Sequence, residues 1–188
     1  MRPPLALPAP DMNNSPSAIP AAATPASPEP ASLFQDAHQY GSSTGLAYAG
    51  AVTPAQAWQL ASSGAAAIVD VRSRYEHEFV GRIPGSALIE WRIYEDGSAG
   101  NGSNGAGVTS RPNPAFLDQL RAAHAPDQPL LLLCRSAVRS HNAAIAATAA
   151  GFTRVYNILE GFEGDKDASG RRNTLAGWRH AGLPWVQG

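Results

Sequence analysis

The sequence predicts an α/β protein built on a mainly parallel sheet, and three features of the chain indicate this class. Short apolar runs, which are typical of buried parallel strands, recur between residues 66 and 159. Segments with helical spacing of apolar residues and helix-starting residues lie between these runs. The runs and the helical segments alternate along the chain, as they do in βαβ units.

The first predicted helix starts at Thr53, because threonine can cap the first turn and the proline that follows fits the first helical position. The run Ala66–Val71 predicts a buried strand that ends in Asp-Val-Arg. We expect a short helix over Tyr75–Phe79 and a strand over Ser86–Trp91. Residues 96–107 hold five glycines, so a long surface loop is expected there.

The second half of the chain contains its most apolar run, Pro129–Leu133, which we interpret as another buried strand. Asn113, followed by proline, predicts the start of a helix before this run. An alanine-rich helix over Ser140–Ala150 and a last strand over Arg154–Leu159 are expected after it. The apolar run leads directly into Cys134, which is the only cysteine of the chain.

Residues 1–45 are rich in proline, alanine and serine and offer little apolar surface to bury. We interpret them as a disordered N-terminal arm that precedes one folded domain over residues 51–188. The segment from Leu33 to Tyr40 is slightly more apolar, and a short docked helix is the alternative there. The arm is either a passive tail or a segment that binds a partner.

The composition excludes several classes of partner. The formal net charge is −1, whereas nucleic acids and anionic membranes require a dense basic surface. The chain has no apolar run of about 20 residues that could cross a membrane. Prolines within the first ten residues interrupt any secretory signal. We therefore expect a cytoplasmic protein that binds neither nucleic acid nor membrane.

Cys134 is the strongest candidate for a catalytic residue. It follows a buried strand and precedes a helix, which places the thiol where ligands bind in open α/β sheets. Successive main-chain N–H groups at the start of that helix can converge on one anion, and Arg135 and Arg139 add positive charge. These influences favour the nucleophilic thiolate. The alternative is a buried structural cysteine, but two arginines and two serines in the next six residues favour the nucleophile.

Five stretches stand out in order along the chain: residues 69–72, 81–86, 134–140 and 151–161, and Trp178 with residues 182–184. In the same order, they resemble the motifs of the rhodanese family. The first is similar to a strand ending in Asp-x-Arg, the second to a His-Ile-Pro-Gly-Ala turn, and the third to an active-site loop of the form Cys-Arg-Ser-Gly-x-Arg-Ser. The fourth resembles Gly-Phe-x-x-Val-Tyr-Asn-Leu-x-Gly-Gly, and the fifth a closing Trp followed by Gly-Leu-Pro.

The resemblance implies a rhodanese-like domain with a mainly parallel five-stranded sheet and helices on both faces. It implies a sulfurtransferase in which Cys134 takes sulfane sulfur from a small anionic donor such as thiosulfate, holds it as a persulfide, and passes it to a thiol, a protein or cyanide. Neither a cofactor nor a metal is implied. The residues that would bind the donor and the persulfide are Arg135, Ser136, Ala137, Val138 and Arg139, and those that would support the loop are Asp70 and Arg72.

The sequence departs from the family pattern at three places. Ala137 stands where the family often has glycine, and a positive φ there would cost roughly 1 kcal/mol. Arg82 replaces the usual histidine, at a position that is typically on the surface. Residues 162–174 form a polar insertion, in which Arg171 and Arg172 are candidate donor or acceptor contacts; a solvated loop is the alternative.

Two other functions fit the same architecture. Dual-specificity phosphatases need five residues between cysteine and arginine, whereas four residues separate Cys134 from Arg139, so the loop is better suited to a single sulfur atom. A sulfur-carrier or regulatory module would hand persulfide from one protein to another with little turnover of small molecules. The five histidines are scattered without the spacing of metal ligands.

Overall fold

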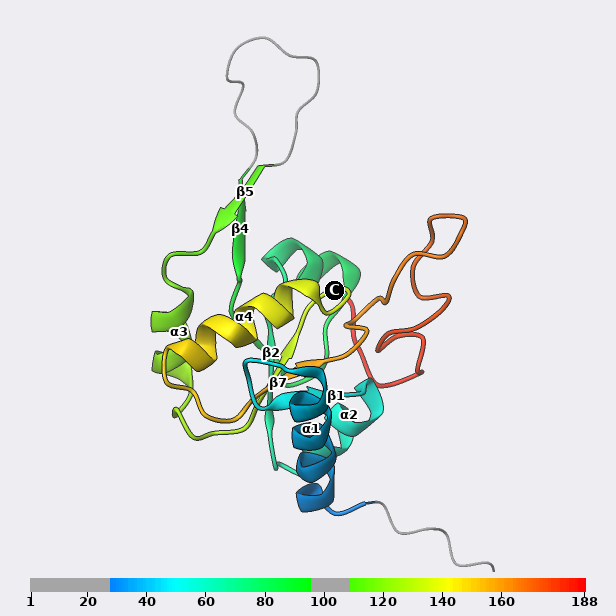
Figure 1. Cartoon of the computed structure of the whole chain (residues 1–188). Helices are drawn as coiled ribbons and strands as arrows, with labels where there is room; N and C mark the ends of the chain where they lie inside the picture. The colour runs from blue at the N-terminus through cyan, green and yellow to red at the C-terminus, as the bar shows by residue number, and fades with distance from the viewer. Residues whose placement is uncertain (1–27, 96–108) are drawn as a thin grey trace, which may run out of the picture.

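A parallel five-stranded sheet forms the centre of the protein, and its strand order is β1-β7-β6-β2-β3. The computed structural model describes residues 28–95 and 109–188 (Figure 1). The expectation of a mainly parallel five-stranded sheet in an α/β fold is therefore confirmed. The strands are β1 (Gly50–Val52), β2 (Ala67–Asp70), β3 (Ala87–Leu88), β6 (Leu130–Leu133) and β7 (Val155–Ile158).

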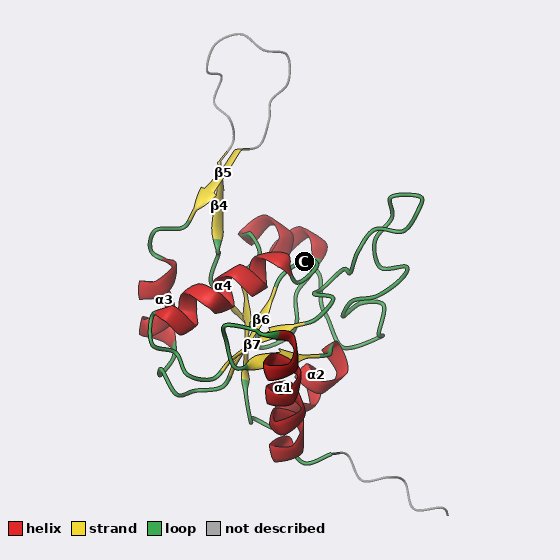
Figure 2. Ribbon diagram, in the orientation of Figure 1, coloured by secondary structure: helices red, strands yellow, loops and turns green. Residues whose placement is uncertain are grey.

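Helices cover both faces of this sheet (Figure 2). Side chains alternate between the two faces along a strand, so β6 sends Leu131 and Leu133 to one face and Leu130 and Leu132 to the other. Helices α1 (Pro30–Thr44) and α2 (Pro54–Ser62) pack on the face that carries Leu131 and Leu133. Helices α3 (Phe116–Ala123) and α4 (Val138–Ala149) pack on the face that carries Leu130 and Leu132. A short π-helix, η1 (Glu76–Val80), follows β2.

The strand predicted over Ser86–Trp91 is shorter than expected, because β3 ends at Leu88 even though Ile89 N–H still donates to Asp70 O. It continues into β4 (Arg92–Glu95), which pairs antiparallel with β5 (Thr109–Pro112) in a separate two-stranded sheet. This hairpin projects away from the main sheet (Figure 2). The predicted loop over 96–107 lies outside the described residues.

The expectation of disorder is wrong for residues 30–44, which form α1. Leu33, Phe34 and Ala37 of this helix are buried against the sheet. The helix lies so close to β1 that a Cβ atom added at Gly50 would be 2.0 Å from the carbonyl oxygen of Ala37. The folded unit therefore includes residues well before position 51, and the docked-helix alternative describes this part better. Residues 1–27 lie outside the described part of the chain.

None of the helices in the described ranges has the length and apolar character needed to cross a membrane.

Removing α1 should destabilise the fold. A chain that lacks residues 1–44 loses the burial of Leu33 and Phe34, and each such side chain contributes roughly 1.5–3 kcal/mol. Thermal unfolding followed by circular dichroism should show a melting temperature lower by roughly 2–4 °C for each kcal/mol lost. The reference is a chain that lacks residues 1–27 and keeps all of α1. Equal melting temperatures for the two chains would show that α1 adds no stability.

Candidate active site

Cys134 is placed by the central strand β6, whose last residue precedes it directly. The strand ends between β2 and β7, so the loop that starts at Cys134 lies at the carboxyl edge of the sheet. The segment after β7 holds this loop, because Phe162 N–H donates to Cys134 O at 2.8 Å and Glu163 N–H donates to Arg135 O at 3.0 Å. Gly161 permits this approach, since an added Cβ would lie 2.5 Å from Cys134 O.

The thiol itself is buried, with 1% of the residue exposed. It belongs to the apolar cluster on the α3 and α4 face of the sheet. Ser140, in the first turn of α4, donates a hydrogen bond from Oγ to Cys134 Sγ at 3.2 Å. Donation from a hydroxyl stabilises a charged sulfur more than a neutral one. The sequence placed Ser140 in the loop motif, but we did not predict this role for it.

The main-chain amides that follow Cys134 are available to an anion. Within the described part of the chain, the N–H groups of residues 135–140 donate to no protein acceptor. The first N–H groups of a helix have no partner inside the helix, and the helix dipole makes that end positive. Ala137 adopts the left-handed conformation, with φ 64° and ψ −9°. Ala137 thus has the positive φ that is strained for a residue with a Cβ atom, and consecutive amides around such a residue form an anion-binding nest.

Two residues of the loop lie at its solvent side. Arg135 is exposed and makes no ion pair with a described carboxylate. Val138 is 66% exposed, although it is apolar. The side chains of Ser136 and Ala137 are only partly buried. The rim around the thiol therefore combines one free positive charge with one apolar side chain.

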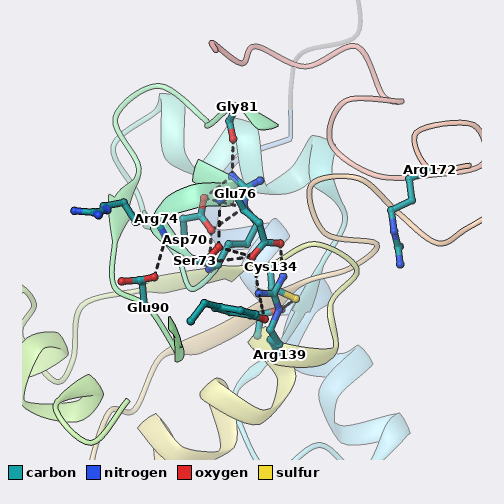
Figure 3. Close-up of polar contacts among 12 residues, drawn as sticks. Asp70, Ser73, Arg74, Glu76, Gly81, Glu90, Cys134, Arg139 and Arg172 are labelled. Carbon is teal, nitrogen blue, oxygen red and sulfur yellow. Dashed lines mark hydrogen bonds and ion pairs between the residues drawn. The ribbon is translucent and has the colours of Figure 1, made fainter. Parts of the chain in front are cut away.

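Arg139 is engaged by a carboxylate that we did not predict (Figure 3). Its guanidinium donates to both carboxylate oxygens of Glu76 at 2.6 and 2.7 Å, and also to Tyr94 Oη at 3.3 Å. Burial raises the pKa of Glu76, but Arg139 and hydrogen bonds from Ser73 outweigh burial and lower this pKa to about 2. Burial lowers the pKa of Arg139, yet its contacts with Glu76 raise that pKa overall. The positive charge expected from Arg139 is consequently balanced by Glu76.

Asp70 and Arg72 form a second ion pair, which is fully buried. Arg72 donates to Asp70 Oδ2 at 2.6 Å and to the carbonyl oxygen of Gly81 at 2.7 Å. Its guanidinium also lies 4.1 Å from the ring centre of Phe162, the residue whose N–H holds Cys134 O. Neither side chain hydrogen-bonds to Cys134 in the described structure. Asp70 and Arg72 therefore support the loop indirectly, through Phe162, whose N–H group bonds to Cys134 O.

The insertion over residues 162–174 does not bring a free arginine to the thiol. Arg172 donates to the carbonyl oxygen of Gly164 within the insertion, and its side chain stands apart from Cys134 (Figure 3). Arg171 is exposed. The solvated-loop interpretation fits these two residues better. Arg82, at the position of the family histidine, pairs with Val186 near the surface.

The chain is similar in sequence and in structure to several known proteins. The family model of the rhodanese-like domain matches residues 53–168. The crystal structure of Rv0390 from M. tuberculosis is 41% identical in sequence with a TM-score of 0.59, over 75% of this chain and 99% of that one. The rhodanese-like domain of the Alr3790 protein from Anabaena sp. is 16% identical with a TM-score of 0.50, over 73% of this chain and 78% of that one, and it bears on the fold alone. Thiosulfate sulfurtransferase GlpE of Actinobacillus pleuropneumoniae is 25% identical over 133 residues, which are 71% of this chain and 89% of that protein.

The Glu76 ion pair should make stability depend on pH. The folded-state pKa of about 2 lies below the usual 4.5 of glutamate. The ionised carboxylate therefore stabilises the fold above about pH 4.5, by an amount of the order of 3 kcal/mol, and this stabilisation disappears as the pH falls through 2. We expect Glu76→Gln to lower the free energy of unfolding in urea at neutral pH, and we expect the deficit to shrink toward pH 3.

The control for this measurement is Asp118→Asn, which removes an exposed ion pair with Arg121. Exposed pairs contribute about 0–1 kcal/mol, so this variant should unfold like the natural chain across the same range. A Glu76→Gln deficit that stays constant with pH would contradict the assignment of the charge effect to Glu76.

Proposed function

The chain is a member of the rhodanese-like domain family, and from this premise we propose that it is a sulfurtransferase that carries sulfane sulfur on Cys134. The donor is a small anion such as thiosulfate, and the acceptor is a thiol or cyanide. The observation that carries the proposal is the thiol at the start of a loop whose next six N–H groups have no acceptor among the described residues. Such a cradle stabilises one negative charge without any cofactor.

In the first half of the proposed reaction, the Cys134 thiolate attacks the outer sulfur of thiosulfate. A sulfur–sulfur bond forms at Cys134 as the bond inside thiosulfate breaks, and sulfite leaves with the electron pair. In the second half, an acceptor thiolate or cyanide attacks the outer sulfur of the persulfide. The products are an acceptor persulfide or thiocyanate, and the electron pair returns to the Cys134 thiolate. The Ser140 hydroxyl and the free amides would hold the anionic sulfur in each state.

The arrangement of Arg139 favours sulfur transfer over phosphate hydrolysis. A phosphatase loop uses its arginine to hold the oxygens of a tetrahedral phosphate. Arg139 already gives both of its terminal nitrogens to Glu76, and one of them also contacts Tyr94. A single anionic sulfur needs no such two-pronged contact, because main-chain amides and one hydroxyl suffice.

The second candidate is a sulfur carrier or regulatory module that exchanges persulfide with other proteins. The exposed apolar side chains of Val138 on the loop and of Phe79 on η1, which is 67% exposed, favour it. Turnover with thiosulfate and cyanide, compared with transfer from a persulfidated protein, separates the two functions. Both proposals include no nucleic-acid and no anionic-membrane partner, because the formal net charge is close to neutral. A cytoplasmic location is part of both proposals.

Loss of the thiol should abolish sulfur transfer. Cys134→Ser should release no sulfite from thiosulfate, because a serine hydroxyl cannot form a persulfide. Mass spectrometry of the natural chain after incubation with thiosulfate should show an adduct of about 32 Da, one sulfur atom, at Cys134. Circular dichroism should show the same fold for both chains. Sulfite release by Cys134→Ser at the natural rate would refute the mechanism.

The exposed charge of Arg135 should assist an anionic donor. Arg135→Gln is expected to raise the KM for thiosulfate severalfold with a smaller change in kcat, because a surface charge mainly affects the encounter of ions. The difference should shrink as salt is added. Arg121→Gln removes an exposed arginine from α3 and serves as the control. A KM for thiosulfate that is unchanged by Arg135→Gln would show that donor binding does not use this charge.

A further inference from the structure

The carbonyl group of Ala137 is held by donors from two different elements. It accepts hydrogen bonds from His141 N–H at 3.0 Å and from Asn157 Nδ2 at 3.2 Å. Ser140 Oγ also lies 3.2 Å from this oxygen, but its single proton cannot be donated to Ala137 O and to Cys134 Sγ at once. Ala137 itself is in the left-handed conformation, which is unfavourable for a residue with a Cβ atom. His141 belongs to α4 and follows Ala137 closely in sequence, whereas Asn157 belongs to β7.

Asn157 is an unusual residue for its position. It lies in β7 directly beside Leu132 of β6, where it is 4% exposed. Its Oδ1 atom is buried and has no hydrogen-bond partner among the described residues. A buried polar atom without a partner destabilises a fold. An apolar side chain of similar size would avoid this cost, whereas asparagine offers the hydrogen bond from its Nδ2 to the Ala137 carbonyl oxygen.

A second buried side chain contacts the helix that supports this carbonyl group. Tyr48 is 6% exposed, and its Oη is 2.8 Å from His141 Nδ1 on α4. The N–H group of the same histidine donates to the Ala137 carbonyl oxygen. Tyr48 therefore supports one of the two donors to this oxygen, and Asn157 is the other.

We propose that Asn157 is a positioning residue for the sulfur-carrying loop, and this rests on the proposed function. A trans peptide unit is planar and its C=O and N–H bonds point in opposite directions. Holding the Ala137 oxygen toward Asn157 therefore fixes the Val138 N–H on the other side, where it has no acceptor in the described structure. If this peptide unit turned over, a carbonyl oxygen would replace the N–H and repel an anionic sulfur.

The test compares Asn157→Ala with Asn142→Ala. The control is matched, because Asn142 Nδ2 also donates to a carbonyl oxygen, that of Val138, at 3.2 Å, but on the exposed side of α4. The readouts are the rate of Cys134 alkylation by iodoacetamide as a function of pH and the yield of persulfide from thiosulfate. We expect Asn157→Ala to slow alkylation at neutral pH by about three- to tenfold, the effect of one lost hydrogen bond, and to move its profile to higher pH. Asn142→Ala should match the natural chain.

Two further variants keep the test independent of stability. Asn157→Leu fills the same space and removes the unpartnered Oδ1, so it should unfold at the same or a higher temperature and still show the shifted alkylation profile. Adding Ala137→Gly to Asn157→Ala should restore part of the alkylation rate, because glycine adopts the positive φ without strain.

The outcomes separate this inference from the sulfurtransferase proposal. A shifted alkylation profile in Asn157→Leu supports the positioning role, even if the natural chain forms no persulfide, in which case the sulfurtransferase proposal alone fails. Profiles of Asn157→Ala and Asn157→Leu that coincide with that of the natural chain overturn the positioning role, whatever the persulfide yield.

Discussion

The burial of β6 on both faces is the constraint on which the rest of the structure depends. Its four leucines are all fully buried, two in each apolar cluster, so the strand can occupy only a central position in the sheet. A central parallel strand must end at the carboxyl edge, with neighbours on both sides. The residue after it, Cys134, is therefore surrounded by the segments that follow β2 and β7. The site is a consequence of where the most apolar strand has to lie.

Two ion pairs organise the loops at this edge in different ways. Asp70 and Arg72 are completely buried and join the end of β2 to Gly81 and Phe162. Glu76 and Arg139 are partly exposed and join η1 to the start of α4. A buried pair is destabilising unless its geometry and additional hydrogen bonds are good, so these contacts also fix the loops in one arrangement. The loop that starts at Cys134 is thus held by contacts on the side that faces the sheet, while Arg135 and Val138 are exposed to solvent.

The sequence was sufficient for the features that depend on local pattern. The alternation of apolar runs with capped helical segments predicted the parallel sheet, and Thr53 does cap α2 together with Gln56. The position of Cys134 after the apolar run followed from the same pattern. The strand over Ser86–Trp91 was predicted too long. Its apolar residues Ile89 and Trp91 still donate to Asp70 O and to Val71 O, but regular strand structure ends at Leu88.

Contacts between residues far apart in sequence could not be predicted. Glu76 and Arg139 are 63 positions apart, and nothing in the sequence around Glu76 indicates which basic residue it will pair with. The helix α1 was considered only as an alternative, because its few apolar residues, Leu33 and Phe34 among them, become stabilising only when they pack against the sheet. The close approach of this helix to Gly50 is likewise invisible in the sequence. Ser140 belongs to the loop motif, but its hydrogen bond to the thiol could not be predicted, because that contact depends on how the chain turns at Ala137.

The burial of the Cys134 sulfur has a consequence for which sulfur atom of a persulfide an incoming thiolate can attack. At 1% exposure, the bare sulfur is shielded from any bulky reagent. A second sulfur atom bound to it would stand about 2.05 Å from the first, one bond further from the main chain. An incoming thiolate would then meet the outer atom first, and attack at the inner atom, which would yield a dead-end mixed disulfide, is sterically disfavoured.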